Sequence, residues 1–186
     1  TEGSSGTKMD VEKTAEEVNK LLELKNTGTV EIAKIDIEPK YKEEDFKDCQ
    51  TLIGTFSTTY SGRGTGRVTN MDVASSKINE YVVYPEEIFS TNAAFGPTTY
   101  DNGYREAPVI VGGELVEGFG GGVCQVSSTL YNALLYSELE IVERRNHSQK
   151  VGYSDWGFDA TLAGDYIDLK FRNDTDLPVF VESYLT

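Results

Sequence analysis

The feature that most constrains this chain is a run of glycines that leads into an apolar helical pattern. Residues 118–124 read Gly-Phe-Gly-Gly-Gly-Val-Cys, the densest glycine cluster in the sequence. From Gln125 to Ser137 the apolar side chains fall on one stripe of a helix, formed by Val126, Leu130, Ala133 and Leu134. Glycine adopts positive φ and leaves backbone amides uncovered. The pattern therefore predicts a tight turn that places Cys124 at the N-terminus of a helix.

A cysteine in that position is suited to nucleophilic chemistry. Unpaired N–H groups and the positive end of the helix dipole favour a thiolate and can hold the oxyanion of a tetrahedral intermediate. His147 is the chain's one histidine and follows a predicted strand at 140–144. We predict that Cys124 is the nucleophile of an acyl transfer and His147 its base. An inert buried thiol is the alternative.

A third group usually orients the imidazole of such a pair. Asp159 is the first choice, because Gly157-Phe-Asp-Ala-Thr161 places it between a loop and a strand, and Asp155, Asp165 and Asp168 are alternatives. For Ser128, helix capping is the competing role. The predicted oxyanion or substrate-binding residues are Gly121, Gly122, Gln125, Ser128 and Asn92.

Composition excludes several classes of protein. With 31 acidic and 17 basic residues the formal net charge is −14, which opposes binding to nucleic acid and suits cationic partners such as free amines. No run approaches the roughly 20 apolar residues of a membrane span. The two cysteines and one histidine offer no metal-ligand spacing, so we expect no metal or other cofactor. A Cys49–Cys124 disulfide is possible from spacing, but we predict a free Cys124 thiol, as a nucleophile requires.

The sequence divides into a short lead, a small N-terminal piece and one main domain. Residues 1–6 are interpreted as an added or flexible lead, which leaves room for an export signal or anchor upstream. Residues 7–45 combine a helix at 10–24, capped by Asp10, with a strand at 29–37. Residues 50–186 predict an α+β domain in which a mainly antiparallel sheet packs with a central helix starting at Cys124.

The expected elements of the main domain are short. A helix is predicted at 67–80, with Asn70 or Asp72 as its N-cap, and residues 92–97 are predicted to form a loop. The predicted strands are 53–60, 81–84, 88–89, 109–111, 141–144, 160–162, 167–171 and 179–184.

Three segments closely resemble the VanW family. They are Gly120-Gly-Gly-Val-Cys-Gln-Val-Ser-Ser-Thr-Leu-Tyr-Asn-Ala133, Glu140-Ile-Val-Glu-Arg-Arg-Asn-His-Ser148 and Asp168-Leu-Lys-Phe-Arg-Asn-Asp-Thr-Asp-Leu-Pro-Val179. Further matches are Arg67-Val-Thr-Asn70, Phe89-Ser-Thr-Asn92 and Gly96-Pro97, so the likeness covers residues 50–184. Met9-Asp-Val-Glu-Lys-Thr14 resembles the end of the peptidoglycan-binding domain that commonly precedes VanW domains.

The resemblance implies a function in the cell wall. The family is named for vancomycin-resistance gene clusters, and members are linked to L,D-transpeptidation of peptidoglycan. Cys124 would then attack the carbonyl after the third residue of a donor tetrapeptide stem, expel D-alanine and pass the acyl group to an acceptor amine. The implied location is the extracellular face of the cell envelope, with membrane contact only through an upstream anchor. The Ser-His-Gly-Cys signature of YkuD-type L,D-transpeptidases is absent from the sequence.

Two other functions stay open at this stage. One is a cysteine endopeptidase or carboxypeptidase of wall peptides, in which water rather than an amine resolves the acyl-enzyme. The other is a peptidoglycan-binding module in which the glycine turn grips a stem peptide and Cys124 is structural. The products of the reaction, or their absence, distinguish the three.

Overall fold

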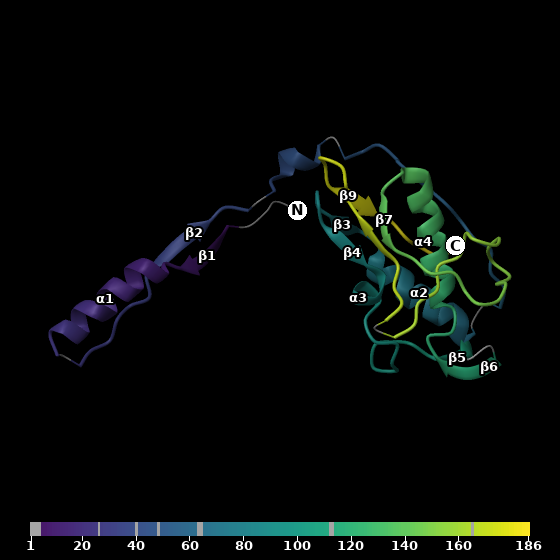
Figure 1. The fold of residues 1–186 in the computed structure, drawn as a ribbon, viewed down its shortest axis with the longest axis horizontal. Helices are drawn as coiled ribbons and strands as arrows, with labels where there is room; N and C mark the ends of the chain where they lie inside the picture. Colours follow the sequence, from purple (N-terminus) through teal and green to yellow (C-terminus); the bar gives the residue numbers. More distant parts are fainter. Residues whose placement is uncertain are drawn as a thin grey trace. The chain divides into compact units, whose positions relative to one another are not determined.

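The computed structural model describes residues 5–25, 27–39, 41–47, 49–62, 65–111, 114–164 and 166–186. The chain divides into two compact units, Thr1–Lys47 and Asp48–Thr186. Figure 1 labels the helices and strands of both. That the first unit is part of a peptidoglycan-binding domain stays a prediction.

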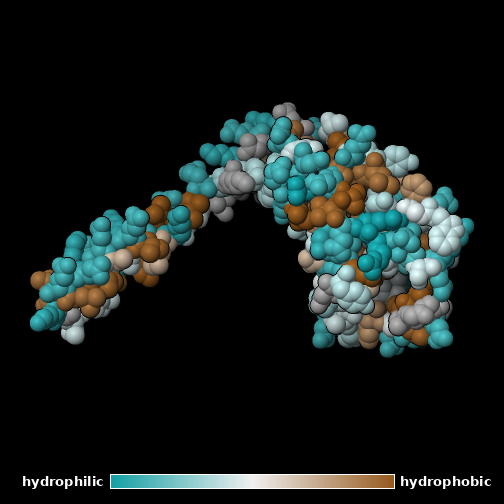
Figure 2. All heavy atoms as spheres, in the orientation of Figure 1, coloured by the Kyte–Doolittle hydropathy of each residue, from teal (hydrophilic) through white to brown (hydrophobic). Residues whose placement is uncertain are grey.

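The first unit contains a two-stranded antiparallel sheet and one helix. Strand β1 (Gly6–Met9) pairs with β2 (Lys34–Ile37), α1 (Val11–Glu23) lies between them in sequence, and the 3-10 helix η1 (Glu43–Phe46) follows. Asp10 caps α1 as predicted by accepting a hydrogen bond from the Lys13 amide at 3.0 Å. None of the α1 side chains is buried, and Leu22 is 66% exposed. Figure 2 shows brown apolar atoms on the surface of this unit.

One expectation for the first unit was wrong in detail. The strand predicted at 29–37 is confined to β2, because residues 29–33 lie beyond the register that β1 can pair with. Gly6, assigned to the lead, is the first residue of β1 and pairs with Ile37. Residues 1–4 of the lead lie outside the described part of the chain.

The second unit is α+β, as predicted, with antiparallel strand pairs around two longer helices. The strand pairs are β3 with β9, β5 with β6, and β4 and β7 on either side of β8. The elements are α2 (Gly66–Ile78), β3 (Tyr81–Val83), β4 (Ile88–Ser90), α3 (Thr91–Phe95), β5 (Glu106–Val111), β6 (Glu114–Phe119), α4 (Val123–Ser137), β7 (Glu140–Glu143), β8 (Lys170–Arg172) and β9 (Val179–Val181).

The core of this unit lies where α2 and α4 pack with each other and with the strands. Ile78 of α2, Leu134 of α4 and Phe171 of β8 belong to one cluster of buried side chains. Phe89 of β4 stacks on Phe171 with ring centroids 5.1 Å apart. Burial of this apolar surface fixes α4, and with it the position of the glycine turn that precedes α4.

The structure corrects several local predictions in this unit. Thr65 caps α2 in place of Asn70 or Asp72, and residues 91–95 form α3 where a loop was expected. Residues 53–60 and 160–162 form no strand, because their polar contacts go to α4: Thr58 bonds Thr129, and the Ala160 amide bonds Ser128. Strand β6 was missed, because its glycine-containing end was interpreted only as part of the turn.

Candidate active site

The glycine turn before α4 is shaped by close backbone packing. Gly120 and Gly122 have φ angles of +85° and +112°, which other residues rarely adopt. A Cβ atom on Gly121 would lie 2.5 Å from the Pro108 carbonyl oxygen, so no other residue fits there. The turn therefore needs glycine for its conformation and for its contact with β5.

The fully buried Asn70 side chain holds this turn in place. Its Nδ2 donates to the Gly121 carbonyl at 2.9 Å and to the Arg105 carbonyl at 3.0 Å, and its Oδ1 accepts from the Arg105 amide at 2.7 Å. Both donors of the amide and one acceptor site of its oxygen are thus used. Asn70 therefore links α2, the start of β5 and the turn. The sequence pattern had instead predicted Asn70 as a candidate N-cap of the helix.

Cys124 is the second residue of α4, two positions after the N-cap Gly122, which supplies no side-chain cap. Within the described residues, the Cys124 amide has no hydrogen-bond partner, whereas the amides of Val123 and Gln125 bond the carbonyls of Gly120 and Gly122. The Leu162 amide lies 3.4 Å from the Cys124 sulfur and donates to it. A helix N-terminus and this donor both stabilise negative charge on sulfur.

His147 and Asp159 form a tight pair next to this thiol. The Asp159 Oδ2 accepts from the His147 amide at 2.6 Å and lies 2.5 Å from Nδ1 of the ring. With Nδ1 directed at the carboxylate, Nε2 is the ring nitrogen left for the thiol. The Arg144 guanidinium adds a 3.6 Å ion pair to Oδ1 and donates to the Asp159 carbonyl at 2.8 Å.

Polar side chains of α4 bring Asp159 to the site. The Ser128 hydroxyl accepts from the Ala160 amide at 2.9 Å, the Ser127 hydroxyl donates to the Ala160 carbonyl at 2.6 Å, and Asn132 donates to the Phe158 carbonyl at 2.6 Å. The helix that carries Cys124 thus also forms hydrogen bonds with both sequence neighbours of Asp159, Phe158 and Ala160.

The chain beyond β7 brings His147 to the same place. The Thr161 amide donates to the Arg145 carbonyl at 2.8 Å, so residues 145 and 161 run side by side. His147 lies two residues after Arg145, and Asp159 lies two residues before Thr161, so the two segments bring their side chains together. Local backbone pairing, and not proximity in sequence, creates the pair.

Electrostatics favour charged forms of His147 and Asp159. Burial alone would lower the pKa of His147, but hydrogen bonds to Cys124 and Asp159 outweigh it and raise the pKa above its usual value. Burial would raise the pKa of Asp159, but hydrogen bonds from the His147 amide and ring lower it overall. The arrangement therefore stabilises the imidazolium that forms when the ring takes a proton from the thiol, with the Asp159 carboxylate on the other side of the ring.

Cys124 lines a groove with a volume of about 1100 Å³. The glycine turn, Cys124 and His147 form part of its lining, and the chain around residues 161–164 forms another part. Tyr153 also lines it, with its ring 6.4 Å from the His147 ring, and burial raises the pKa of its hydroxyl above the usual value. Small-molecule sites usually span about 300–1000 Å³, so this groove has room for more than one small ligand.

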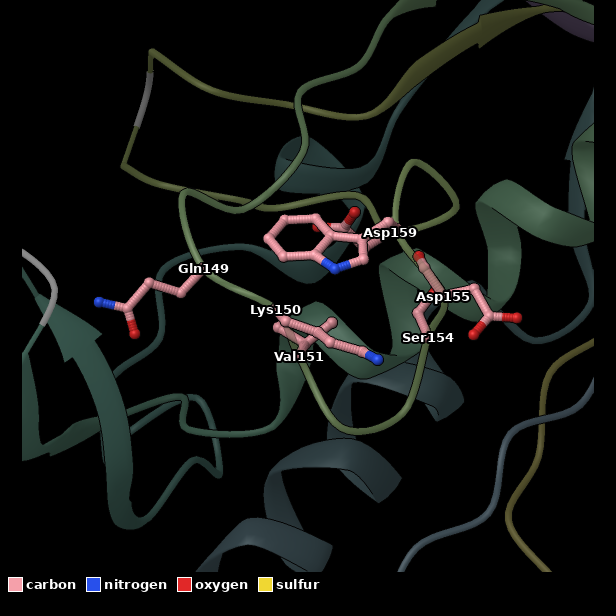
Figure 3. Close-up of a pocket in the computed structure, with 7 residues that line it drawn as sticks. Gln149, Lys150, Val151, Ser154, Asp155 and Asp159 are labelled. Atoms are coloured by element: carbon pink, nitrogen blue, oxygen red, sulfur yellow. The ribbon is translucent and has the colours of Figure 1, made fainter.

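A second, narrow hollow lies behind Asp159, and it has no room for a water molecule. Figure 3 shows Gln149, Lys150, Val151, Ser154, Asp155 and Asp159 around it. The carboxylates of Asp155 and Asp159 point away from each other in this view. Asp155 is exposed, so it does not share the role of Asp159.

The structure brings most of the predicted residues together. Cys124, His147 and Asp159 are adjacent, and Gly121, Gly122, Gln125 and Asn92 line the groove. The Asn92 side chain is committed to the Gly164 and Ile167 carbonyls, at 3.0 and 2.9 Å. Ser128 is fully buried outside the groove lining, and it ties α4 to Ala160.

Of the other candidates for the third group, Asp168 also lines the groove, but its carboxylate is bound by other residues. Asp168 accepts from the Ser90 hydroxyl at 2.6 Å and from the Asn92 amide at 2.9 Å, and Asp165 lies outside the described residues. Sequence reasoning missed Arg67, Tyr153 and Leu162. The motif Arg67-Val-Thr-Asn70 was the signal for the first, whereas a backbone amide such as that of Leu162 leaves no trace in sequence.

Cys124 carries a free thiol in the structure. In the described part of the chain, no group of three or more His, Cys, Asp or Glu side chains is placed to hold a metal ion. Among the same residues, no helix combines the length and the apolar character that crossing a membrane requires.

Comparison with known proteins identifies relatives of this chain. Residues 66–186 match the family described as VanW like protein. The chain is 37% identical over 155 residues to the uncharacterized protein YoaR of Bacillus subtilis (strain 168), covering 83% of this chain and 51% of YoaR. It is 35% identical over 115 residues to the vancomycin B-type resistance protein VanW of Enterococcus faecalis (strain ATCC 700802 / V583), covering 59% and 42% respectively.

These matches set the scope of the comparison. The chain spans about half the length of the curated relatives that it matches. No solved structure matches it. The family match covers the glycine turn, α4 and the loop that carries His147 and Asp159. This chain belongs to the VanW family.

Proposed function

We propose that residues 48–186 form a cysteine-dependent L,D-transpeptidase that cross-links peptidoglycan. The observation that carries the proposal is the Cys124 thiol at the start of α4, with the His147–Asp159 pair beside it and a groove in front of it. A thiol, a base and a group that orients the base are the parts that acyl transfer requires. The name of the enterococcal relative, a vancomycin resistance protein, is consistent with a substrate in the cell wall.

The first half of the reaction forms a thioester. Nε2 of His147 takes the thiol proton, and the Cys124 sulfur attacks the carbonyl carbon of the third residue of the donor stem. The Cys124 amide, which has no partner among the described residues, is placed to donate to the resulting oxyanion. The C–N bond then breaks, and the leaving D-alanine amine takes the proton from the His147 imidazolium.

The second half transfers the acyl group. The amine of an acceptor stem attacks the thioester carbon, and His147 takes the proton that this nitrogen loses. The C–S bond breaks, a new amide bond forms, and the proton returns to sulfur. The volume of the groove is consistent with a donor and an acceptor peptide bound together. The net charge of −14 attracts an acceptor whose amine is protonated in solution, and this amine loses one proton to solvent before it attacks.

The proposal extends to location and to the first unit. The enzyme acts at the extracellular face of the cell envelope, because its substrate is there. The first unit belongs to a peptidoglycan-binding domain that keeps the catalytic unit on the wall. Hydrolysis of wall peptides by the same thioester, with water as the acceptor, is the alternative outcome.

Mass spectrometry of muropeptides tests this proposal. The purified chain is incubated with a disaccharide tetrapeptide and an amine-bearing acceptor stem. A cross-linked dimer with release of D-alanine supports the transpeptidase, whereas a shortened stem without a dimer indicates a hydrolase. His147→Ala should lower the rate by several orders of magnitude but leave measurable residual activity, because the helix N-terminus and the Leu162 amide still stabilise the thiolate. Binding of stems without any product would show a binding module.

A further inference from the structure

Arg67 lies in the groove against the glycine turn. It is the second residue of α2, and it is one of the residues that line the groove with Cys124. A Cβ atom on Gly122 would lie 3.0 Å from the Arg67 carbonyl oxygen and 3.1 Å from its Cγ. The arginine stem therefore packs against a residue that is two positions from the thiol.

Gln125 fixes one edge of the Arg67 guanidinium. The Gln125 Nε2 donates to the Thr58 hydroxyl at 3.1 Å and to the Thr59 carbonyl at 2.9 Å. A carbonyl only accepts, so these contacts determine which end of the amide is Oε1. Oε1 then accepts from the Arg67 Nη2 at 2.8 Å. Because the Gln125 side chain is only 4% exposed, this clamp is rigid.

The other edge of the guanidinium has donors to spare. A guanidinium has five N–H donors, and one of them is used by Gln125. The charge rests 5.8 Å from the centroid of the Tyr153 ring. No ion pair joins Arg67 to a carboxylate of the described residues, whereas Lys170, which also lines the groove, pairs with Glu143 at 2.8 Å. The guanidinium is thus a positioned cation without an anionic partner among the residues that the structure describes.

We propose that Arg67 binds the C-terminal carboxylate of the donor stem, a specificity role that rests on the proposed function. The leaving residue carries this carboxylate, and only the leaving residue's own atoms separate it from the carbonyl that Cys124 attacks. A planar guanidinium binds a carboxylate through two parallel hydrogen bonds. The enzyme then selects stems whose scissile bond is the last one, and it spares internal bonds of the same type.

Binding to the inactive Cys124→Ala variant tests the proposal. Calorimetry compares a tetrapeptide stem that ends in a free carboxylate with the same stem ending in a carboxamide. We expect the acid to bind about ten- to a hundredfold more tightly, the range for charge-assisted hydrogen bonds. Adding Arg67→Gln should reduce this ratio to about one, and Arg67→Lys should leave it intermediate, because a lysine keeps the charge and loses the fork.

The matched control is Arg105→Gln in the same background. Arg105 lies outside the groove lining, and its guanidinium bonds the Gly103 and Tyr104 carbonyls, so this change should leave the ratio unaltered. The ratio is taken within each variant, so any loss of folded protein affects both ligands equally. An equal affinity of Cys124→Ala for acid and amide, a failure to bind either, or an acid preference that survives Arg67→Gln would overturn the proposal.

Turnover separates this inference from the proposed function. If the wild-type chain yields no product from either donor while the Arg67-dependent acid preference persists, the transpeptidase proposal fails and carboxylate recognition stands. If cross-linking proceeds equally with acid and amide donors, the transpeptidase proposal stands and carboxylate recognition by Arg67 fails.

Discussion

Replacement of Asp159 by asparagine removes one negative charge from the site and keeps the shape of the side chain. Oδ2 of Asp159 accepts two hydrogen bonds, from the His147 amide at 2.6 Å and from Nδ1 at 2.5 Å. The bond to the amide is present before and during the reaction, so its weakening affects stability. The bond to Nδ1 strengthens when the ring becomes an imidazolium, so its weakening affects the rate.

The magnitude follows from that second bond. Hydrogen bonds to charged groups contribute about 1.5–3 kcal/mol, against about 0.5–1.5 kcal/mol for neutral ones. Because the transition state carries charge on both partners, we take the loss as about 1.5–3 kcal/mol, which is a factor of about ten to a hundred in kcat. KM should change little, because Asp159 is not part of the groove lining.

The pH profile gives an independent readout. The hydrogen bond to Asp159 is one of the contacts that raise the pKa of His147, so Asp159→Asn lowers that pKa. The limb of the rate profile that reports His147 should move to lower pH, whether it reports loss of an imidazolium or formation of a neutral base. The assay is the initial rate of D-alanine release from a tetrapeptide donor, measured across pH.

Asp155→Asn is the matched control for this prediction. It makes the same chemical change in the same loop, at an exposed side chain that points away from Asp159 (Figure 3). It should leave kcat and the profile as they are. A kcat for Asp159→Asn within twofold of the wild type, with an unshifted limb, would refute the orienting role of Asp159.

Three further predictions concern stability. Gly121→Ala places a Cβ atom 2.5 Å from the Pro108 carbonyl oxygen, so it should lower the free energy of unfolding by about 1–3 kcal/mol in urea denaturation, and an unchanged midpoint would contradict this packing. Because the pKa of His147 is raised in the fold, the His147–Asp159 contact stabilises the fold fully below about pH 6.5, and this stabilisation is lost as pH rises through the folded-state pKa of His147. Because the pKa of Asp159 is lowered, its contribution is fully present above about pH 3.9 and is lost as pH falls through the folded-state pKa of Asp159. The stability difference between wild type and Asp159→Asn should thus be largest between those values, and a difference independent of pH would contradict it. Residues 48–186 should unfold cooperatively on their own, as judged by circular dichroism, since they form a compact unit.

The parts of the fold that could be predicted from sequence are those with strong local signals. Asp10 and the apolar spacing behind it predict α1, and the glycine run followed by the stripe from Val126 to Leu134 predicts α4. Short strands were found by their β-branched residues, but the extended segment near Thr58 was misassigned. Its alternation is that of a strand, although its partner is the side of α4. Alternation of polar and apolar residues indicates that one face of a segment is buried, but it does not indicate whether a strand or a helix covers that face.

The site was partly predictable for the same reason. Cys124 and His147 are marked by rarity and by the glycine turn, whereas the proximity of Asp159 depends on the pairing of Thr161 with Arg145, which no local pattern encodes. Asn70 shows the limit most clearly. Near the start of a helix an asparagine normally suggests a cap, yet here tertiary packing turns it inward to hold the glycine turn.

Intact-protein mass spectrometry of the wild-type chain, incubated with a tetrapeptide donor and no acceptor, tests the central claim most directly. The account predicts a mass increase equal to the donor minus D-alanine, located on the peptide that contains Cys124 and removed when an acceptor amine is added. Cys124→Ala should show no adduct, and Cys124→Ser at most a trace, because a hydroxyl ionises far less readily than a thiol. Cross-linking at the wild-type rate by Cys124→Ala, or an adduct on any other residue, would contradict it.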